Sequence, residues 1–164
     1  LGIPLAPAID ALAQVEPVGD RGRVSRFGGQ LVVADCYNAN PSSMRAALSS
    51  FVALRDTCPG PLIAVLGDML EMGADAPQFH RTLGEEVAAL GLDALIGVGV
   101  ETRHAVAEAN ERGIHARGFA PDDLDAIVAA IEAAIGDGGA VLFKASRGIR
   151  LERVVERLRG ALEV

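Results

Sequence analysis

The apolar and polar positions of this chain alternate in two different periods. Short runs rich in Val, Ile, Leu and Ala, bounded by glycine, proline or polar residues, are typical of buried strands. Between these runs, apolar residues recur at spacings of three and four, which predicts helices that pack through one face. We expect strands at residues 31–35, 62–66, 94–98, 115–119 and 140–143. We expect helices at residues 43–55, 78–90, 101–112, 121–135 and 150–162.

A hairpin precedes this alternation. Gly28 and Gly29 separate residues 24–27 from residues 30–35, and two glycines permit positive φ at both centres of a tight turn. Strands that alternate with helices through short connections form a mainly parallel sheet with helices on both faces. The pattern therefore predicts an α/β fold, a Rossmann-like three-layer α/β/α domain with an antiparallel N-terminal hairpin at its edge.

The beginning of the chain has a different pattern. Residues 1–20 carry three prolines around a short apolar segment, residues 8–15, which predicts one small helix. We expect residues 1–20 to be a lead-in from a preceding domain and residues 21–164 to form one domain, since this length suits a single core. The chain starts at Leu1 rather than at Met, so we expect a fragment of a longer protein.

Composition and charge narrow the function classes. Half of the residues are apolar but only 4% are aromatic, which suits a parallel sheet with an aliphatic core. No apolar run reaches the roughly 18 residues of a membrane span and no signal peptide opens the chain, so we expect a cytoplasmic protein without a membrane partner. The net charge of −7 argues against a nucleic-acid partner. We expect Cys36 and Cys58 to be reduced thiols outside any metal site.

Ligands of parallel sheets bind beyond the carboxyl ends of the strands, so the residues there carry the candidate chemistry. The first parallel strand is followed by Asp35, Tyr37, Asn38 and Asn40, a dense set of hydrogen-bonding groups. The structural alternative is a loop with a helix N-cap at Asn40 or Ser42. An N-cap requires only one such residue, so this density favours a binding loop.

Two further strand ends carry charged groups. Asp68 and Glu71 follow the second strand, with His80 near the start of the next helix; the alternatives are a solvated loop and a surface histidine. Lys144, Ser146 and Arg147 follow the last strand. A serine and fixed cations at a helix N-terminus favour anion binding, whereas the alternative is a simple Ser cap before a solvated helix.

The sequence lacks the usual phosphate-binding loops. Lys144 is the only lysine and follows Phe143 rather than glycine, so no G-x-x-x-x-G-K-[ST] motif is present. Gly97 and Gly99 are not followed by the third glycine of a dinucleotide-binding turn, and Ser146 lacks a G-x-S-x-G context. A domain with an anion-binding corner and no phosphate loop requires groups from elsewhere to complete a binding site.

The order of these segments resembles one family. Residues 22–23 (GR), 35–44 (DCYNANPSSM), 66–73 (LGDMLEMG), His80 and 144–148 (KASRG) resemble the carboxy-terminal domain of the Mur ligases, and within them the branch that adds D-alanyl-D-alanine. This resemblance implies an ATP-dependent ligase that joins D-alanyl-D-alanine to UDP-N-acetylmuramoyl-tripeptide in peptidoglycan precursor synthesis. The tripeptide carboxylate would be phosphorylated by ATP, and the dipeptide amine would then displace phosphate.

The resemblance also implies a division of labour between domains. The protein's own N-terminal and central domains would hold the UDP-sugar and, for the central domain, ATP and Mg²⁺. We therefore expect no metal site and no catalytic residue in this chain alone, and no turnover by it. The resemblance assigns nucleotide contacts to Arg23, Asp35, Tyr37, Asn38 and Asn40. It assigns the region around D-alanyl-D-alanine to Asp68, Glu71, His80, Lys144, Ser146 and Arg147.

Two departures from the family pattern and two alternatives remain. Ala145 stands where the family usually has glycine, and Cys36 replaces a more usual hydroxyl residue. Alanine disfavours positive φ, so a close backbone approach to a ligand is less favourable there. A stand-alone flavodoxin-like binding module would have the same fold but would not explain the paired loop motifs. A related folylpolyglutamate-type or cyanophycin-type ligase would share the domain but act on another substrate.

Overall fold

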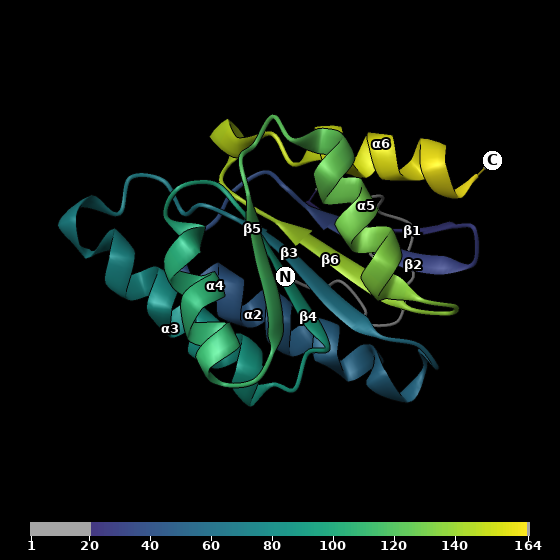
Figure 1. Ribbon diagram of the computed structural model, residues 1–164, viewed down its shortest axis with the longest axis horizontal. Helices are drawn as coiled ribbons and strands as arrows, with labels where there is room; N and C mark the ends of the chain where they lie inside the picture. The colour runs from purple at the N-terminus through teal and green to yellow at the C-terminus, as the bar shows by residue number, and fades with distance from the viewer. Residues whose placement is uncertain (1–20, 164) are drawn as a thin grey trace, which may run out of the picture.

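The computed structural model describes residues 21–163, which form a six-stranded sheet with helices on both faces (Figure 1). The strand order is β1-β2-β6-β3-β4-β5, and only β1 is antiparallel to its neighbour. The strands are β1 (Arg21–Phe27), β2 (Gln30–Asp35), β3 (Leu62–Gly67), β4 (Ala94–Val98), β5 (His115–Phe119) and β6 (Ala140–Lys144). The α-helices are α2 (Pro41–Val52), α3 (Ala76–Ala89), α4 (Thr102–Glu111), α5 (Leu124–Ile135) and α6 (Glu152–Leu162). The short 3₁₀ turns are η1 (Ala53–Asp56), η2 (Gly73–Asp75) and η3 (Arg147–Ile149).

The core consists of two apolar layers, one on each face of the sheet. Ile63 and Val65 of β3 pack with α5 and α6, whereas Leu62, Ala64 and Leu66 of the same strand pack with α2, α3 and α4. This division follows from the alternation of side chains along a strand. Figure 1 shows the same arrangement, with α5 and α6 on one face and the other three helices opposite. The predicted three-layer fold is confirmed.

The N-terminal hairpin is also confirmed. Gly28 and Gly29 form its turn with φ of 54° and 92°, and β1 pairs with β2 from Phe27 opposite Gln30 to Arg21 opposite Asp35. Glycine is required at position 28 for a second reason, because a Cβ there would lie 2.5 Å from the carbonyl oxygen of Leu162. The hairpin turn therefore packs directly against the end of α6.

All five described α-helices start one to three residues away from the sequence expectation. Helix α2 starts at Pro41 instead of residue 43 because Asn40 is its N-cap, and α5 starts at Leu124 instead of residue 121. Helix α6 starts at Glu152 instead of residue 150, because η3 intervenes and Arg150 adopts a left-handed φ of 59°. The last strand is therefore not followed directly by an α-helix N-terminus. The predicted anion site, formed by Ser146 and cations at such a helix N-terminus, is wrong in this respect.

Some expectations concern residues outside the described part of the chain. The predicted lead-in at residues 1–20, including its helix at residues 8–15, lies outside residues 21–163. The boundary between that lead-in and the domain remains a prediction. Among the described helices, none is long and apolar enough to span a membrane.

Candidate functional site at the carboxyl ends of the strands

The loops that carry the sequence motifs leave neighbouring strands at the same edge of the sheet. Asp35 at the end of β2 is level with Lys144 at the end of β6, and Lys144 is level with Leu66 near the end of β3. Strand β4 lies next to β3 and completes this edge. We call it the rim. It brings together three motif segments that are far apart in the sequence.

Lys144 lies beneath the rim and is only 2% exposed. Its Nζ donates to Oδ2 of Asp35 at 2.5 Å and to the backbone carbonyl of Asn38 at 2.9 Å. A buried ammonium group requires such partners, since an uncompensated charge is strongly unfavourable away from water. Lys144 thus joins the end of β6 to the loop after β2, while the Asp35 side chain remains 28% exposed.

The two asparagines of the first motif are engaged locally. Asn38 accepts a hydrogen bond from the backbone N–H of Ala39 at 2.9 Å. Asn40 caps α2, because its side chain accepts from Ser43 N–H at 2.9 Å while Ser43 Oγ accepts from Asn40 N–H at 3.1 Å. This reciprocal capping box satisfies otherwise unpaired backbone donors. The structural alternative of an N-cap at Asn40 is confirmed.

Ser146 connects the loops instead of capping a helix. Its Oγ accepts from the backbone N–H of Leu70 at 3.0 Å and donates to the carbonyl of Ala39 at 3.5 Å. Its own N–H donates to the carbonyl of Asp68 at 3.2 Å, and its side chain makes no cap hydrogen bond. The neighbouring Ala145 is fully buried in the core and does not adopt positive φ, so alanine is unstrained at that position.

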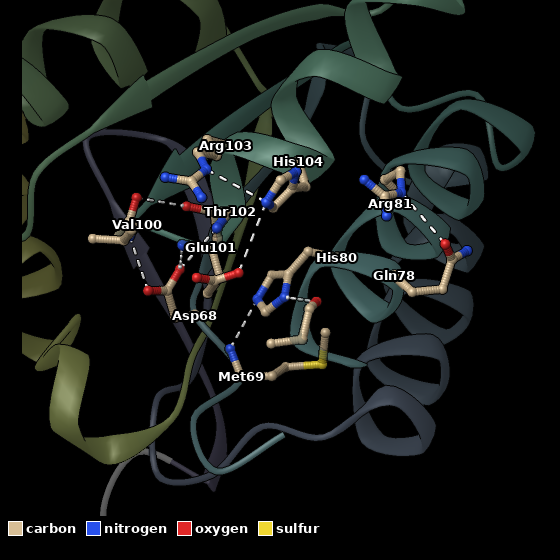
Figure 2. A network of polar contacts seen from close by, with 12 residues as sticks. Asp68, Met69, Gln78, His80, Arg81, Val100, Glu101, Thr102, Arg103 and His104 are labelled. Atoms are coloured by element: carbon tan, nitrogen blue, oxygen red, sulfur yellow. Dashed lines mark hydrogen bonds and ion pairs between the residues drawn. The ribbon is translucent and has the colours of Figure 1, made fainter. Parts of the chain in front are cut away.

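Asp68 is directed into the protein, where it caps the start of α4 (Figure 2). Its carboxylate accepts from the backbone N–H groups of Val100, Glu101 and Thr102 at 2.9, 3.0 and 2.8 Å. Only 5% of the residue is exposed. The close approach depends on Gly99, because a Cβ there would lie 2.4 Å from the Asp68 carboxyl group. A carboxylate at a helix N-terminus is stabilised by unpaired donors and by the helix dipole.

His80 is likewise turned inward, and the alternative of a surface histidine is wrong. The residue is fully buried, with Nε2 accepting from the backbone N–H of Met69 at 3.1 Å and Nδ1 placed 2.8 Å from the carbonyl of Ala76 (Figure 2). These partners assign the neutral tautomer with its proton on Nδ1. His80 and Asp68 together fix the segment that follows β3.

Glu71 lies at the tip of that fixed segment and is exposed. Its φ of 64° is left-handed, which is uncommon for a residue with a side chain. The preceding Leu70 is 41% exposed. The inward contacts of Asp68 and His80 thus hold an acidic and an apolar side chain at the rim.

Tyr37 forms the exposed counterpart on the other side of the rim. It is 43% exposed, and the guanidinium carbons of Arg21 and Arg147 lie 3.7 and 5.3 Å from its ring centroid. The guanidinium of Arg21, and secondarily that of Arg147, lowers the pKa of the phenol below its ordinary 10.0. Arg21 lies outside the motifs that are visible in the sequence. Its position opposite Asp35 in the hairpin ladder is the signal that would have placed it at the rim.

Arg23 is not brought together with Asp35. It is paired with Ala34 in the ladder and lines a hollow that also contains Glu152, Glu156 and Arg159 of α6. Asp35 lines a different hollow, on the face of the sheet that α2 covers. The two expected nucleotide contacts therefore lie on opposite faces of the sheet.

The described residues contain no metal-binding cluster. Within residues 21–163, no group of three or more His, Cys, Asp or Glu side chains is arranged to hold an ion. The carboxylates within this range thus do not form a Mg²⁺ site by themselves. Cys36 and Cys58 are both buried and form no disulfide, as predicted.

Comparison with known proteins identifies the family. The family described as "Mur ligase, glutamate ligase domain" matches residues 22–147. The chain belongs to the Mur ligase family. The Mur ligase domain is 35% identical over 131 residues to the UDP-N-acetylmuramoyl-tripeptide–D-alanyl-D-alanine ligase of Escherichia coli, covering 79% of this chain and 27% of that protein. It is 34% identical to the protein of the same name from Synechocystis, covering 88% of this chain and 31% of that protein.

Solved structures give the same relationship. MurF from Acinetobacter baumannii superimposes with a TM-score of 0.82 at 28% identity, over 97% of this chain and 34% of that one. MurF from Thermotoga maritima in complex with ADP superimposes with a TM-score of 0.77 at 30% identity, over 94% of this chain and 34% of that one. This Mur ligase domain thus spans about a third of the length of its relatives. The flavodoxin-like alternative gains no support from these comparisons.

Proposed function

We propose that this Mur ligase domain is the carboxy-terminal part of a cytoplasmic enzyme that joins D-alanyl-D-alanine to UDP-N-acetylmuramoyl-tripeptide in peptidoglycan precursor synthesis. The observation that carries this proposal is the shared name of the relatives from Escherichia coli and Synechocystis, at 35% and 34% identity. The reaction uses ATP to activate the tripeptide carboxylate as an acyl phosphate. The dipeptide amine then forms the amide bond and phosphate leaves.

The exposed rim residues are proposed to contact the substrates. Arg147 is suited to the terminal carboxylate of the dipeptide, because a guanidinium binds a carboxylate through two parallel hydrogen bonds. Glu71 is suited to the dipeptide amine. Tyr37 and the exposed part of Asp35 would face the nucleotide. These groups come from three neighbouring strand ends, so one closed site can be contacted by all of them.

The buried motif residues are proposed to position the others. Lys144 orients Asp35, and Ser146 ties the segment after β3 to the loop after β2. Asp68 and His80 hold the backbone that carries Glu71. These side chains have hydrogen-bonding partners inside the domain, which supports a role through the backbone they fix. Asn38 and Asn40 similarly shape the loop after β2, and Arg23 would reach a nucleotide only from the side of α6.

ATP and Mg²⁺ are proposed to be held mainly by the central domain. The described residues supply neither a phosphate loop nor a metal cluster, and the structure of a relative in complex with ADP supports nucleotide use in this family. Large exposed apolar side chains at or near the rim, namely Tyr37, Leu70, Phe79 and Val100, would be covered when the preceding domains close on this one. Closure would exclude water from the acyl phosphate.

The test is ligation by the full-length gene product that contains this chain. We expect ATP-dependent joining of D-alanyl-D-alanine to the UDP-linked tripeptide, and no turnover by the 164-residue chain alone. Replacing Arg147 with Gln should raise the KM for the dipeptide about tenfold with little change in kcat, since it removes uniform binding of a charged group. The matched control is Arg26→Gln, at the far end of β1.

The outcome also separates the alternative substrates. Transfer of glutamate to a folate, or extension of an aspartate polymer, with no use of D-alanyl-D-alanine would contradict the proposal. ATP hydrolysis at an enzymatic rate by the isolated chain would contradict the division of labour between domains.

A further inference from the structure

Two arginines at the rim share one aromatic platform. The guanidinium carbon of Arg21 lies 3.7 Å from the ring centroid of Tyr37, and that of Arg147 lies 5.3 Å from it. Arg21 comes from the first strand and Arg147 from the turn after the last one. Contact with an aromatic ring orients a guanidinium and leaves its N–H donors available in the plane of the group. Both guanidinium groups therefore lie close to the same side chain of the rim.

Among residues 21–163, no acidic side chain pairs with either arginine. Asp35 is level with Arg21 in the ladder, but its carboxylate is bound by Lys144 at 2.5 Å. Within residues 21–163, no carboxylate lies within salt-bridge distance of Arg21 or Arg147, although Arg153 and other arginines on the helices are paired. In a chain of net charge −7, a pair of cations without a carboxylate partner in this range creates a local positive potential that attracts anions.

We propose that Arg21 and Arg147 form, on the Tyr37 ring, a clamp for one oxyanion group, either a carboxylate or a phosphate. The planar fork of each guanidinium matches the spacing of two oxygens in both groups. Arg21 has no role in the motif comparison, so the clamp adds a residue to the site. The contacts of both arginines with Tyr37 do not depend on the proposed function, and only the choice of D-alanyl-D-alanine as one probe rests on it.

Tyr37 provides a direct readout of this clamp. It is the only tyrosine of the chain, and there is no tryptophan, so the ultraviolet absorbance and fluorescence above the phenylalanine region report on Tyr37 alone. The 164-residue chain would be titrated at constant ionic strength with inorganic phosphate, with D-alanyl-D-alanine, with the C-terminal amide of that dipeptide, and with chloride. We expect a saturable change with at least one of the two oxyanions, and none with the amide or chloride.

Variants assign the binding to the two arginines. Arg21→Gln and Arg147→Gln should each weaken the saturable binding about tenfold, the loss of a charge-assisted contact. Arg26→Gln removes the same charge from the other end of β1 and should change it less than twofold. Circular dichroism would confirm that each variant is folded. Should Arg21→Gln fail to fold, Arg21→Lys would replace it, with a smaller but measurable weakening expected because the planar fork is lost.

Two results would overturn the clamp. One is a response that rises linearly without saturation, and the other is an Arg26→Gln effect as large as that of Arg21→Gln, since both indicate diffuse attraction. Saturation by phosphate but not by the dipeptide would assign the clamp to a phosphate, and the reverse to a carboxylate. The proposed function is tested separately, by ligation in the full-length protein. A negative result for the clamp and a negative result for ligation can therefore be distinguished.

Discussion

The segment after β3 and the cationic pair on Tyr37 lie at the same edge of the sheet but use their polar groups in opposite ways. Asp68 and His80 are buried, and their side chains bind backbone N–H and carbonyl groups of the same domain. Arg21 and Arg147 are exposed and have no carboxylate partner in residues 21–163. The same edge of the sheet therefore contains both polar groups that build the rim and exposed charged groups without a carboxylate partner among residues 21–163.

Charge type explains this division. A carboxylate accepts several hydrogen bonds, so Asp68 can pair with three backbone donors at the start of α4 and does not require a cation as its partner. A cation can be buried only with a compensating group, which Lys144 finds in Asp35. Asp35 is thus engaged by Lys144 and forms no ion pair with Arg21, its partner in the ladder. The supporting residues thus have partners within the domain, whereas the two exposed arginines have no carboxylate partner in residues 21–163.

The largest expected effect comes from breaking that buried pair. Asp35→Ala leaves the Lys144 ammonium in the interior with only the carbonyl of Asn38, and should lower the free energy of unfolding by about 3 kcal/mol. Urea denaturation measures this change. The control is Asp125→Ala, which removes an exposed partner of Arg157 and should change stability by about 0.5 kcal/mol or less. Equal effects for the two variants would show that Lys144 does not depend on Asp35 to compensate a buried charge.

An intermediate effect is expected at the cap of α4. Asp68→Ala leaves three backbone N–H groups without their acceptor and should lower the free energy of unfolding by about 2 kcal/mol. Asp75→Ala is the control, since Asp75 precedes α3 without a side-chain cap hydrogen bond and should change stability by about 0.5 kcal/mol at most. Hydrogen exchange should accelerate at Val100, Glu101 and Thr102 in the first variant. Unchanged exchange at these three amides would contradict the capping role.

Much of the fold could be predicted from local pattern. Alternating apolar runs located the five parallel strands, and Gly28 and Gly29 located the hairpin, because each signal depends on residues close in sequence. The start of α6 was missed for the converse reason. Arg150 adopts a left-handed conformation that its residue type disfavours, and the local sequence contains no signal for the 3₁₀ turn that precedes α6.

The candidate site was harder to predict, since residue type does not give the direction of a side chain. Asp68 and Glu71 are both acidic and three positions apart, yet one caps a helix more than thirty residues away and the other is exposed. Arg21 was missed because its neighbour Tyr37 is brought to it only by the pairing of β1 with β2. Long-range contacts therefore decide which motif residues remain available to a ligand.

The smallest expected effect is in the ionisation of Tyr37. The guanidinium of Arg21, and then that of Arg147, lowers the pKa of this phenol from its ordinary 10.0, so a spectrophotometric titration should give a midpoint below that value. The sign for stability follows from linkage: the contribution of the ionised phenol is fully present above 10.0 and is lost as the pH falls through the lowered pKa. Because Tyr37 is exposed, the optical midpoint is the appropriate measurement.

Arg21→Gln should raise the midpoint more than Arg147→Gln, and Arg26→Gln should leave it unchanged. A bound oxyanion should raise the midpoint in the wild-type chain, since it offsets the charge of both arginines. A midpoint that does not change in Arg21→Gln would show that this guanidinium does not act on the Tyr37 ring.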